Sequence, residues 1–401
     1  MRIVFLTLKL DLAAGGGANR GLDVKLRGLQ DLGHDVSLIT IFPELNRLPD
    51  TLPYRVINAP CANRTYPAVQ RHVVATLRAH EAGADAFHID GSTCVWGGGM
   101  YRAEGGRVPT VAYIPTYTEA INLLTLEAPD PAKGLLPWLQ FHVMVRLQWL
   151  KHFVWAKCVG LRAARQLDAI FGDSPVLISH YVNFGFPAER MHVMPEFVDE
   201  ERFRQTAVHP EPAPALFGPH RPFRLLHAGR LLKMKGVDLL IRAVAELRAS
   251  GKNVTLTLVG DGPQRERLEN LAGRLNVKEA VAFDAWTDEN GLPHAYAACD
   301  AFVHPCRFPE PFGRTVLEAL FFDRPIVTTM GSGSEWVAGD AGVTAKMGDL
   351  ASLTAVLGRL YDDPKRLAAC SAAAFERIRF FDHRAWTKKL ADHLALLVSS
   401  E

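Results

Sequence analysis

Two carboxylates in one short segment have the spacing and setting of a ligand-binding pair. Glu310 lies in a loop with a proline on each side, and Glu318 follows eight residues later. Gly313 separates that loop from a predicted helix, so Glu318 lies between one and two turns inside the helix. Carboxylates accept hydrogen bonds from the hydroxyl groups of a polyol. The segment therefore predicts a loop acid and a helix acid that hold one polyhydroxylated ligand.

The start of the same predicted helix adds a second kind of group. The amides of Phe312 and Gly313 lack an acceptor inside the helix, so they can bind an anion such as a phosphate. The alternative is that both acids are solvated and that Glu318 pairs with Arg314, one helical turn earlier. The spacing in the sequence leaves both interpretations open.

Cations stand at the matching place in an earlier strand–helix unit. A predicted strand at 223–228 leads to Arg230 and Lys235, and a helix begins near Gly236. Cations just beyond a buried strand suit a diphosphate better than they suit a core. An ordinary solvated loop is the alternative.

Two glycine-rich turns also follow predicted strands. Glycines at 15, 16 and 17 precede a helix, so Gly16 and Gly17 could let the backbone approach a phosphate closely. In the second turn, at 259–263, we expect the glycines to serve turn geometry and Asp261 to cap the following helix.

Short β-branched runs alternate with helical patterns along the whole chain. Such alternation predicts an α/β protein whose parallel sheets are covered on both faces by helices, which include 18–32 and 69–82. A Pro-rich linker at 209–222 divides the chain into two Rossmann-like halves, which we expect to face an interdomain cleft. The expected strands are 2–8, 35–40, 54–58, 86–90, 110–114, 169–172, 223–228, 254–259, 281–284, 301–304 and 325–329.

Composition excludes several classes of function. The 401 residues are 48% hydrophobic and carry a formal net charge of only +2, which argues against a nucleic-acid partner. Six scattered cysteines without a CxxC pair are typical of reduced thiols in the cytoplasm. The sequence contains no D-x-D or HExxH motif, so we expect no metal site. No apolar run approaches the roughly 20 residues that span a bilayer.

Taken in order, these motifs resemble the retaining nucleotide-sugar glycosyltransferases of family 4, which have the GT-B fold. The resemblance covers nearly the whole chain. Its motifs are the glycine-rich turn at 15–20, the segments 32–36, 171–174 and 193–203, Gly229-Arg230 with Lys235-Gly236, 260–263, and Glu310 with seven residues before Glu318.

The resemblance implies a role for each motif residue. Arg230, Lys235 and Glu310 would be catalytic, the two cations neutralising the donor diphosphate and Glu310 holding the transferred sugar. Glu318 would bind the ribose hydroxyls. Further donor contacts would come from Gly16, Gly17, Phe312, Gly313 and Trp286.

The resemblance also implies boundaries and partners. Residues 1–205, completed by a C-terminal helix at 383–401, would form the acceptor domain, and 206–382 the donor domain. We expect a UDP- or GDP-sugar donor, a glycan or lipid-linked acceptor, and no metal or other cofactor. The same scaffold also leaves open an epimerase, a hydrolase, a phosphorylase or a nucleotide-sugar binding protein without activity.

The sequence departs from the family pattern at one point. Members commonly carry a histidine after the strand matched here by 110–114, where this chain has Pro115. That histidine contacts the transferred sugar. The residues that could replace it or contact the acceptor are His88, Asp90, Tyr113, Thr116 and Tyr117, although a histidine at a strand end is more often structural.

A basic, aromatic segment at 135–166 has two interpretations. Between 131 and 167 the chain has six lysines or arginines and no acid. An interfacial helix at the inner face of a membrane would use this composition. The alternative, which we favour, is a long helix that packs its aromatic side chains against the first domain.

Overall fold

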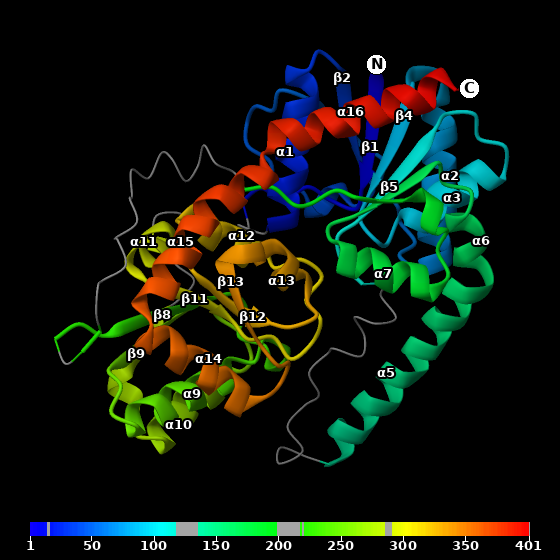
Figure 1. Cartoon of the computed structure of the whole chain (residues 1–401). Coiled ribbons are helices and arrows are strands. Elements are labelled where there is room, and N and C mark those ends of the chain that lie inside the picture. Colours follow the sequence, from blue (N-terminus) through cyan, green and yellow to red (C-terminus); the bar gives the residue numbers. More distant parts are fainter. Residues whose placement is uncertain (14–16, 118–134, 199–216, 219, 285–290, 401) are drawn as a thin grey trace. The chain divides into compact units, whose positions relative to one another are not determined.

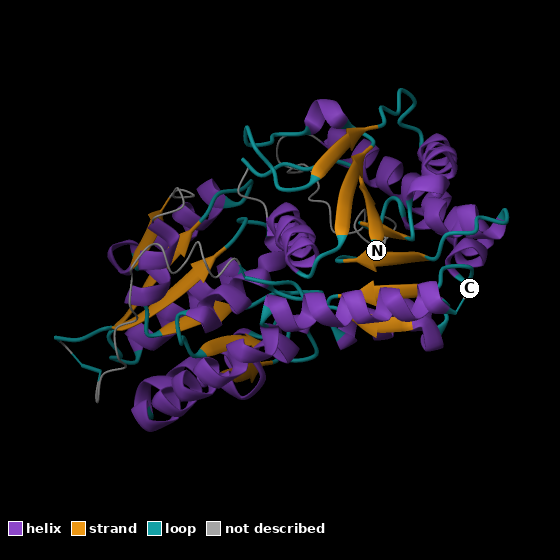
Figure 2. Ribbon diagram, turned by 90° about the horizontal axis from the view of Figure 1, so that it is seen from above, coloured by secondary structure: helices purple, strands orange, loops and turns teal. Residues whose placement is uncertain are grey.

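The computed structural model describes residues 1–13, 17–117, 135–198, 217–218, 220–284 and 291–400. The chain divides into two compact units, Met1–Phe197 with His383–Glu401, and Val198–Asp382. Each unit contains a parallel sheet with helices on both of its faces (Figures 1 and 2). The predicted fold class of two parallel-sheet α/β domains is confirmed. The boundary expected at 205/206 lies outside the described residues.

The sheet of the first unit has, in the described residues, the strand order β3-β2-β1-β4-β5-β6-β7, and every pairing is parallel. The predicted strands agree with the structure within two residues at each end, and only the short β7 was not predicted. The strands are β1 (Arg2–Thr7), β2 (Asp35–Thr40), β3 (Arg55–Asn58), β4 (Ala86–Asp90), β5 (Thr110–Ile114), β6 (Ala169–Gly172) and β7 (Met191–Val193).

Helices cover this sheet because they bury apolar faces in the core of the unit. On one face, α1 and α16 share a core with strand residues such as Phe5 and Val111. Helix α2 packs on α3, and α3 packs on α6. The helices of the unit are α1 (Gly17–Asp31), α2 (Tyr66–His80), α3 (Val95–Ala103), α5 (Leu135–Trp155), α6 (Leu161–Ala164), α7 (Pro175–Phe184) and α16 (His383–Ser399).

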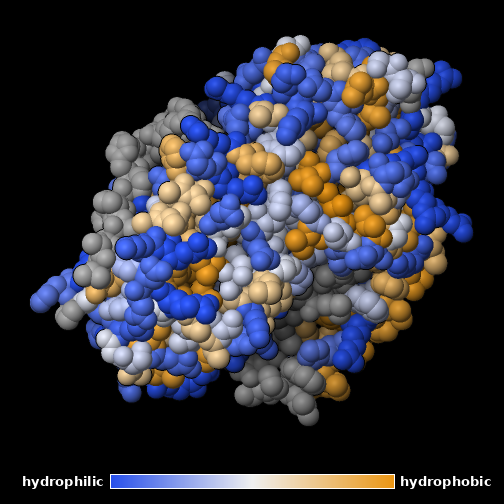
Figure 3. All heavy atoms as spheres, in the orientation of Figure 1, coloured by the Kyte–Doolittle hydropathy of each residue, from blue (hydrophilic) through white to orange (hydrophobic). Residues whose placement is uncertain are grey.

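Helix α5 is the longest helix of the described residues, and a π-helical turn at Ala156–Gly160 joins it to α6. Its first turns extend away from the sheet of its unit (Figure 1). Hydrophobic side chains lie exposed along the lower right edge of the surface, where α5 runs (Figure 3). Among the described helices, none is long and apolar enough to cross a membrane.

The sheet of the second unit has the order β10-β9-β8-β11-β12-β13 in the described residues, again with parallel pairings. The predicted strands agree with it, and only β13 was not predicted. The strands are β8 (Phe223–Ala228), β9 (Val254–Val259), β10 (Val281–Asp284), β11 (Ala301–His304), β12 (Ile326–Thr329) and β13 (Gly342–Ala345).

Two hydrophobic clusters lie on the two faces of this sheet. Successive strand residues alternate between them, so that Leu225 belongs to one cluster and Leu226 to the other. Helices α9, α10 and α14 cover the first face, and α11, α12, α13 and α15 the second. The helices are α9 (Val237–Ala249), α10 (Arg265–Arg274), α11 (Gly291–Ala298), α12 (Arg314–Phe321), α13 (Gly333–Ala338), α14 (Leu350–Asp362) and α15 (Pro364–Ile378).

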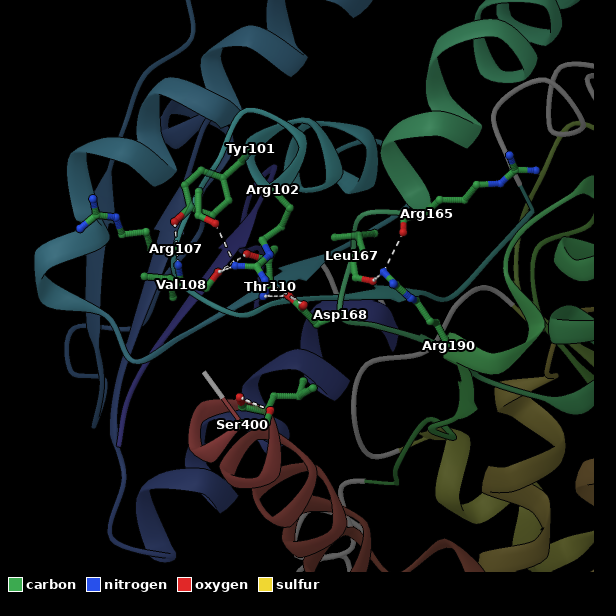
Figure 4. Close-up of polar contacts among 12 residues, drawn as sticks. Tyr101, Arg102, Arg107, Val108, Thr110, Arg165, Leu167, Asp168, Arg190 and Ser400 are labelled. Atoms are coloured by element: carbon green, nitrogen blue, oxygen red, sulfur yellow. Dashed lines mark hydrogen bonds and ion pairs between the residues drawn. The ribbon is translucent and has the colours of Figure 1, made fainter.

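The amino ends of β5 and β6 are joined by a network of polar contacts (Figure 4). The Asp168 carboxylate accepts hydrogen bonds from the Thr110 amide at 2.7 Å and from the Arg102 guanidinium at 3.1 Å. Arg190 donates to the carbonyls of Arg165 and Leu167 at 2.7 and 2.6 Å. These contacts satisfy backbone groups where the strands begin, at the edge opposite to that where ligands of such sheets bind.

Helix α16 contributes to the first unit although it follows the second unit in the sequence. Trp386, Leu390 and Leu394 are buried in the same core as the α1 residues Leu22 and Leu26. The pattern of this amphipathic helix did not indicate which half it joins, whereas the family resemblance implied that it completes the first domain; the structure groups it with the first unit.

Removing one of these side chains tests how much α16 contributes to stability. Leu390 is completely buried, so Leu390→Ala should lower the free energy of unfolding by about 2–5 kcal/mol. Leu396→Ala on the same helix is the matched control, because Leu396 is 69% exposed and its loss should cost less than about 0.5 kcal/mol. Urea unfolding measures both. Equal losses in the two variants would show that α16 is not part of the core.

Candidate functional site

The predicted cations of the second unit come together with Glu310 at one edge of its sheet. Strands β8 and β11 are neighbours and parallel, so their carboxyl ends lie side by side. This is the point where the strand order reverses, which is where ligands bind in open α/β sheets. The loop after β8 contains Arg230 and Lys235, and the loop after β11 contains Glu310.

Direct backbone contacts hold these two loops against each other. The Arg307 amide donates to the Met234 carbonyl at 2.7 Å. Gly236 has a φ of +69°, and a Cβ there would lie 2.0 Å from the Pro305 carbonyl oxygen. Only glycine allows this approach without moving one loop. The backbone therefore fixes where the side chains on the two loops meet.

Lys235 and Glu310 form an ion pair across the two loops. Nζ lies 2.5 Å from Oε2, and the side chains are only 19% and 15% exposed. Burial lowers the pKa of Lys235, but the Glu310 carboxylate and Cys306 together outweigh burial, and the pKa is raised overall. Lys235 is therefore a cation held close to a carboxylate, a contact between the predicted residues that the sequence did not indicate.

The groups around this pair remain open to an anion. The Arg230 side chain is exposed and, among the described residues, forms no hydrogen bond or ion pair. The amides of Phe312 and Gly313 donate to no acceptor in the described part of the chain. Gly313 is the N-cap of α12, with a φ of +92°, whereas the ring of Phe312 is buried against Trp336 and Phe381. Cationic and amide donors thus surround the end of the sheet.

The contacts of Glu318 agree in part with each of its two interpretations, a ligand-binding acid and a partner of Arg314. Its Oε2 accepts a hydrogen bond from the Tyr296 hydroxyl at 2.9 Å, and Oε1 lies 3.5 Å from Nε of Arg314. The side chain is 13% exposed, so it is not a solvated surface acid. These two donors orient the carboxylate while leaving further lone pairs for ligand hydroxyls.

One group of side chains in the described residues has the composition of a metal site. His304, Cys306 and Glu310 offer ligand atoms that all lie within 4.8 Å of one another. Burial raises the pKa of the Cys306 thiol and lowers that of His304, so both are neutral. The Lys235 ammonium already neutralises Glu310, and His304 also bonds Ser334 Oγ at 3.1 Å. The donor set therefore does not fit a cation beside Lys235.

The turn after β9 differs from its prediction. Asp261 does not cap α10; its carboxylate accepts from the neighbouring Gly262 amide at 2.7 Å, and α10 begins after Gln264 without a side-chain cap. A cap at Asp261 would require α10 to begin at residue 262, whereas the helix begins three residues later, at Arg265.

A second buried polar cluster lies at the carboxyl edge of the first unit's sheet. Asp90 ends β4, and its carboxylate lies 3.4 Å from Nζ of Lys25, which extends from α1. The ammonium also lies 3.6 Å from the centre of the Tyr113 ring, and the Tyr113 hydroxyl donates to Glu196 at 3.0 Å. Burial, opposed by Lys25 and assisted by Glu196, raises the pKa of Asp90.

The remaining predicted contacts of this unit are mostly buried. His88 is fully buried and stacks on Phe5 with ring centroids 4.2 Å apart, so its ring is not accessible to a sugar. Burial lowers its pKa, which favours the structural interpretation. Tyr117 is buried against His180, and the Thr116 carbonyl accepts from the Tyr181 hydroxyl at 2.6 Å. The structure joins Asp90 and Tyr113 in one cluster and leaves the other three outside it.

Two predicted residues, Gly16 and Trp286, lie outside the described residues, and Gly17 begins α1. The sequence analysis missed Lys25, Glu196, Tyr296 and Cys306. Cys306 could have been predicted, because it lies just after a predicted strand and four residues before Glu310. Lys25 gave a weaker one, as a cation on the apolar face of a helix.

Two family models match the chain over consecutive parts. The model described as "Glycosyltransferase Family 4" matches residues 15–202, and that described as "Glycosyl transferases group 1" matches 214–377.

Named relatives are similar over part of the chain. A lipopolysaccharide core biosynthesis glycosyltransferase, LpsD of Rhizobium meliloti, is 36% identical over 43% of this chain and 50% of its own length. A GDP-mannose-dependent alpha-(1-6)-phosphatidylinositol monomannoside mannosyltransferase of Mycolicibacterium smegmatis is 30% identical over 55% of this chain and 61% of its own. The chain thus spans between half and two thirds of the length of these relatives.

Solved structures share the fold over the whole chain. The sucrose-phosphate synthase of Thermosynechococcus elongatus gives a TM-score of 0.74 at 18% identity and covers 100% of both chains. Anabaena HepE, solved in complex with UDP and glucose, gives 0.66 at 18% identity over 98% of this chain and 99% of its own. At such identities the likeness concerns the fold.

The Lys25–Asp90 pair makes a test of the first unit's cluster. Lys25→Met should lower the free energy of unfolding at neutral pH by about 3–5 kcal/mol, because it leaves a buried carboxylate unpaired. Without Lys25 the raised pKa of Asp90 rises further, so the folded state binds a proton more tightly than the unfolded state. Unfolding free energy should therefore fall as the pH rises from about 4 through that pKa.

Denaturant unfolding at several pH values measures this effect. Lys25→Met with Asp90→Asn should recover part of the loss and flatten the pH dependence. Arg27→Met, which breaks an exposed pair with Asp23 on the same helix, should cost no more than about 1 kcal/mol. A pH-independent loss in Lys25→Met would contradict an ionised Asp90 at this position.

Proposed function

Because the chain belongs to the family 4 glycosyltransferases, we propose that it moves a hexose from a UDP- or GDP-sugar to a glycan or lipid-linked acceptor. In this proposal the configuration at the anomeric carbon is retained and no metal is required. The single observation that carries it is the Lys235–Glu310 pair at the strand-order reversal of the second unit, with Arg230 exposed beside it.

The charges at this edge support a diphosphate as the ligand. Arg230 has no protein partner among the described residues, so an incoming anion would not have to displace an existing ion pair. Lys235 supplies a second cation in a partly desolvated position, where electrostatic interactions are stronger than in water. Two cations and the α12 amides provide the positive charge that a metal ion would supply elsewhere.

The names of relatives support a nucleotide-sugar donor. One relative is named as dependent on GDP-mannose, and a protein of the same fold was solved with UDP and glucose. These two names differ in the base, so both UDP- and GDP-sugars remain in the proposal. Lipopolysaccharide core and phosphatidylinositol mannoside in the relatives' names favour a lipid-linked acceptor.

Each residue of the second unit has a role in the proposed reaction. Arg230 and Lys235 stabilise negative charge as it develops on the leaving diphosphate. Glu310, held in place by Lys235, accepts hydrogen bonds from hydroxyls of the transferred sugar, and Glu318 accepts them from the ribose. The acceptor hydroxyl would attack from the face that the diphosphate leaves, which retains the configuration. In the first unit, Asp90 is our proposed acceptor-side contact.

We propose that the reaction takes place in the cytoplasm. All six cysteines are free, and five of them are buried, as expected for a protein that keeps its thiols reduced. A lipid-linked acceptor would require peripheral contact with the inner face of a membrane.

Product analysis with labelled donors tests the activity. Each UDP- and GDP-sugar is incubated with and without candidate acceptors, and sugar and nucleotide products are separated. Transfer requires the acceptor. Release of free sugar without an acceptor indicates a hydrolase, interconversion of the sugar an epimerase, and sugar 1-phosphate formed with added phosphate a phosphorylase. Binding of a donor without any product indicates an inactive binding protein.

Arg230→Ala tests the stabilisation of charge in the transition state. Because this side chain is exposed and unpaired in the described part of the chain, its loss should leave the melting temperature unchanged. We expect kcat to fall by about 10²–10³, as when one donor to a developing oxyanion is removed. Arg267→Ala, an exposed arginine on α10, is the control. An unchanged kcat with only a higher KM would show that Arg230 binds the ground state and the transition state equally well.

Glu318→Gln tests the ribose assignment without disturbing the fold. Glutamine keeps an acceptor for the Tyr296 hydroxyl, so the hydrogen bond in the core survives. Replacing the charged acceptor should weaken nucleotide binding by about 1.5–3 kcal/mol. Titration calorimetry measures the affinity of a nucleoside diphosphate for the variant, for the wild type and for a control, Glu266→Gln, which changes an exposed acid. Equal affinity in all three would remove Glu318 from the ribose site.

A further inference from the structure

One face of α5 exposes a continuous stripe of large aliphatic side chains. Of the fifteen large hydrophobic residues exposed in the described part of the chain, eight lie between 136 and 159. Leu136 and Leu147 are 65% and 62% exposed. Members of the stripe recur every three or four residues, which places them on one side of a helix. We define the α5 stripe as Leu136, Leu139, Val143, Leu147, Leu150 and Val154.

The opposite side of α5 attaches the helix to its own unit. Trp155 packs edge-on against Tyr66 and Trp96, with ring centroids 4.9 and 6.1 Å apart. Phe153 packs against Phe184 at 6.0 Å, and Val145 is buried. Among the described side chains, Trp155 and Phe153 therefore pack against the first unit. The aliphatic side chains of the α5 stripe, on the other side of the helix, face outward.

Such a stripe is unusual for a helix exposed to water. A surface helix normally places polar residues opposite its buried face, whereas α5 is apolar on both sides. Contiguous apolar surface of this kind marks a contact with a partner or a membrane. Apolar grooves run along it between Leu139 and Val159.

The charge around the α5 stripe identifies the partner. Arg146 and Lys151 are exposed beside or within it, and between 131 and 167 the chain has six cations and no acid. A second copy of the chain docked by the same stripe would bring like charges together without an acid in the segment to pair them. An anionic lipid surface complements both the apolar side chains and the cations.

We propose that the α5 stripe docks the first unit onto an anionic phospholipid bilayer, with the helix lying in the plane of the interface. The leucines and valines enter the boundary between headgroups and acyl chains, while Arg146 and Lys151 extend to the lipid phosphates. The proposed contact is peripheral, and no described helix is long and apolar enough to span the bilayer. This inference rests on the surface of α5 and not on the proposed transferase activity.

Vesicle co-sedimentation of the full chain at low salt, without donor or acceptor, tests this docking. One set of vesicles is phosphatidylcholine alone, and the other contains equal parts of phosphatidylcholine and phosphatidylglycerol. We expect binding to the anionic vesicles. Leu147→Ser with Leu150→Ser should weaken it on the order of tenfold for each leucine. Arg146→Gln with Lys151→Gln should weaken it roughly fivefold for each cation.

Matched variants elsewhere separate docking from general surface effects. Leu396→Ser removes an exposed leucine from α16, and Arg242→Gln with Arg267→Gln removes two exposed cations from the second unit. Both should bind like the wild type. All the substituted side chains are exposed, so melting temperatures should not change.

Three results would overturn the proposal. The first is no binding of the wild type to anionic vesicles at low salt. The second is equal binding of the α5 and control variants. The third is a concentration-dependent dimer, seen by analytical ultracentrifugation, that the leucine variant abolishes, because then a second copy covers the stripe. Since no nucleotide is present, none of these outcomes depends on whether the chain transfers a sugar.

Discussion

A partly buried ion pair joins the two loops at the carboxyl edge of the second unit's sheet. Lys235 and Glu310 come from loops after two neighbouring strands, 75 residues apart in the sequence, and meet at 2.5 Å. Removing two charges from water is costly, and a pair of this kind is stable only when its geometry is good. Backbone contacts between the loops provide that geometry. In the proposed reaction this desolvation would be useful, because a desolvated cation and an oriented carboxylate would interact strongly with a diphosphate sugar.

The first unit repeats the arrangement in a different form. Its sheet also reverses strand order between β1 and β4, and Lys25 and Asp90 form a buried pair there. In this unit the lysine comes from the helix after the first strand, and Tyr113 and Glu196 close the cluster. Both sheets thus place a lysine and a carboxylate where parallel strands diverge, which is the part of such a fold with most room for polar groups.

Local patterns determined most of what the sequence predicted. Buried parallel strands are continuous β-branched runs, so all of the strands were found except β7 and β13, which have three and four residues. Arg230, Lys235 and Glu310 were predicted because each follows a strand, and Glu318 because it lies in the helix after the Glu310 loop. Contacts between distant residues gave no such signal: Lys25 meets Asp90 65 residues later, and Tyr113 meets Glu196 83 residues later. His88 was named only as a possible sugar contact beside a structural interpretation, and its complete burial favours the structural one.

The close approach at Gly236 has a consequence for how the protein can change. A Cβ at this position would reach within 2.0 Å of the Pro305 oxygen, so any replacement must push apart the loops that carry the ion pair. The glycine needs no contact with a ligand to be indispensable. Selection would therefore remove substitutions of Gly236 as strictly as substitutions of a reacting group, for a purely steric reason.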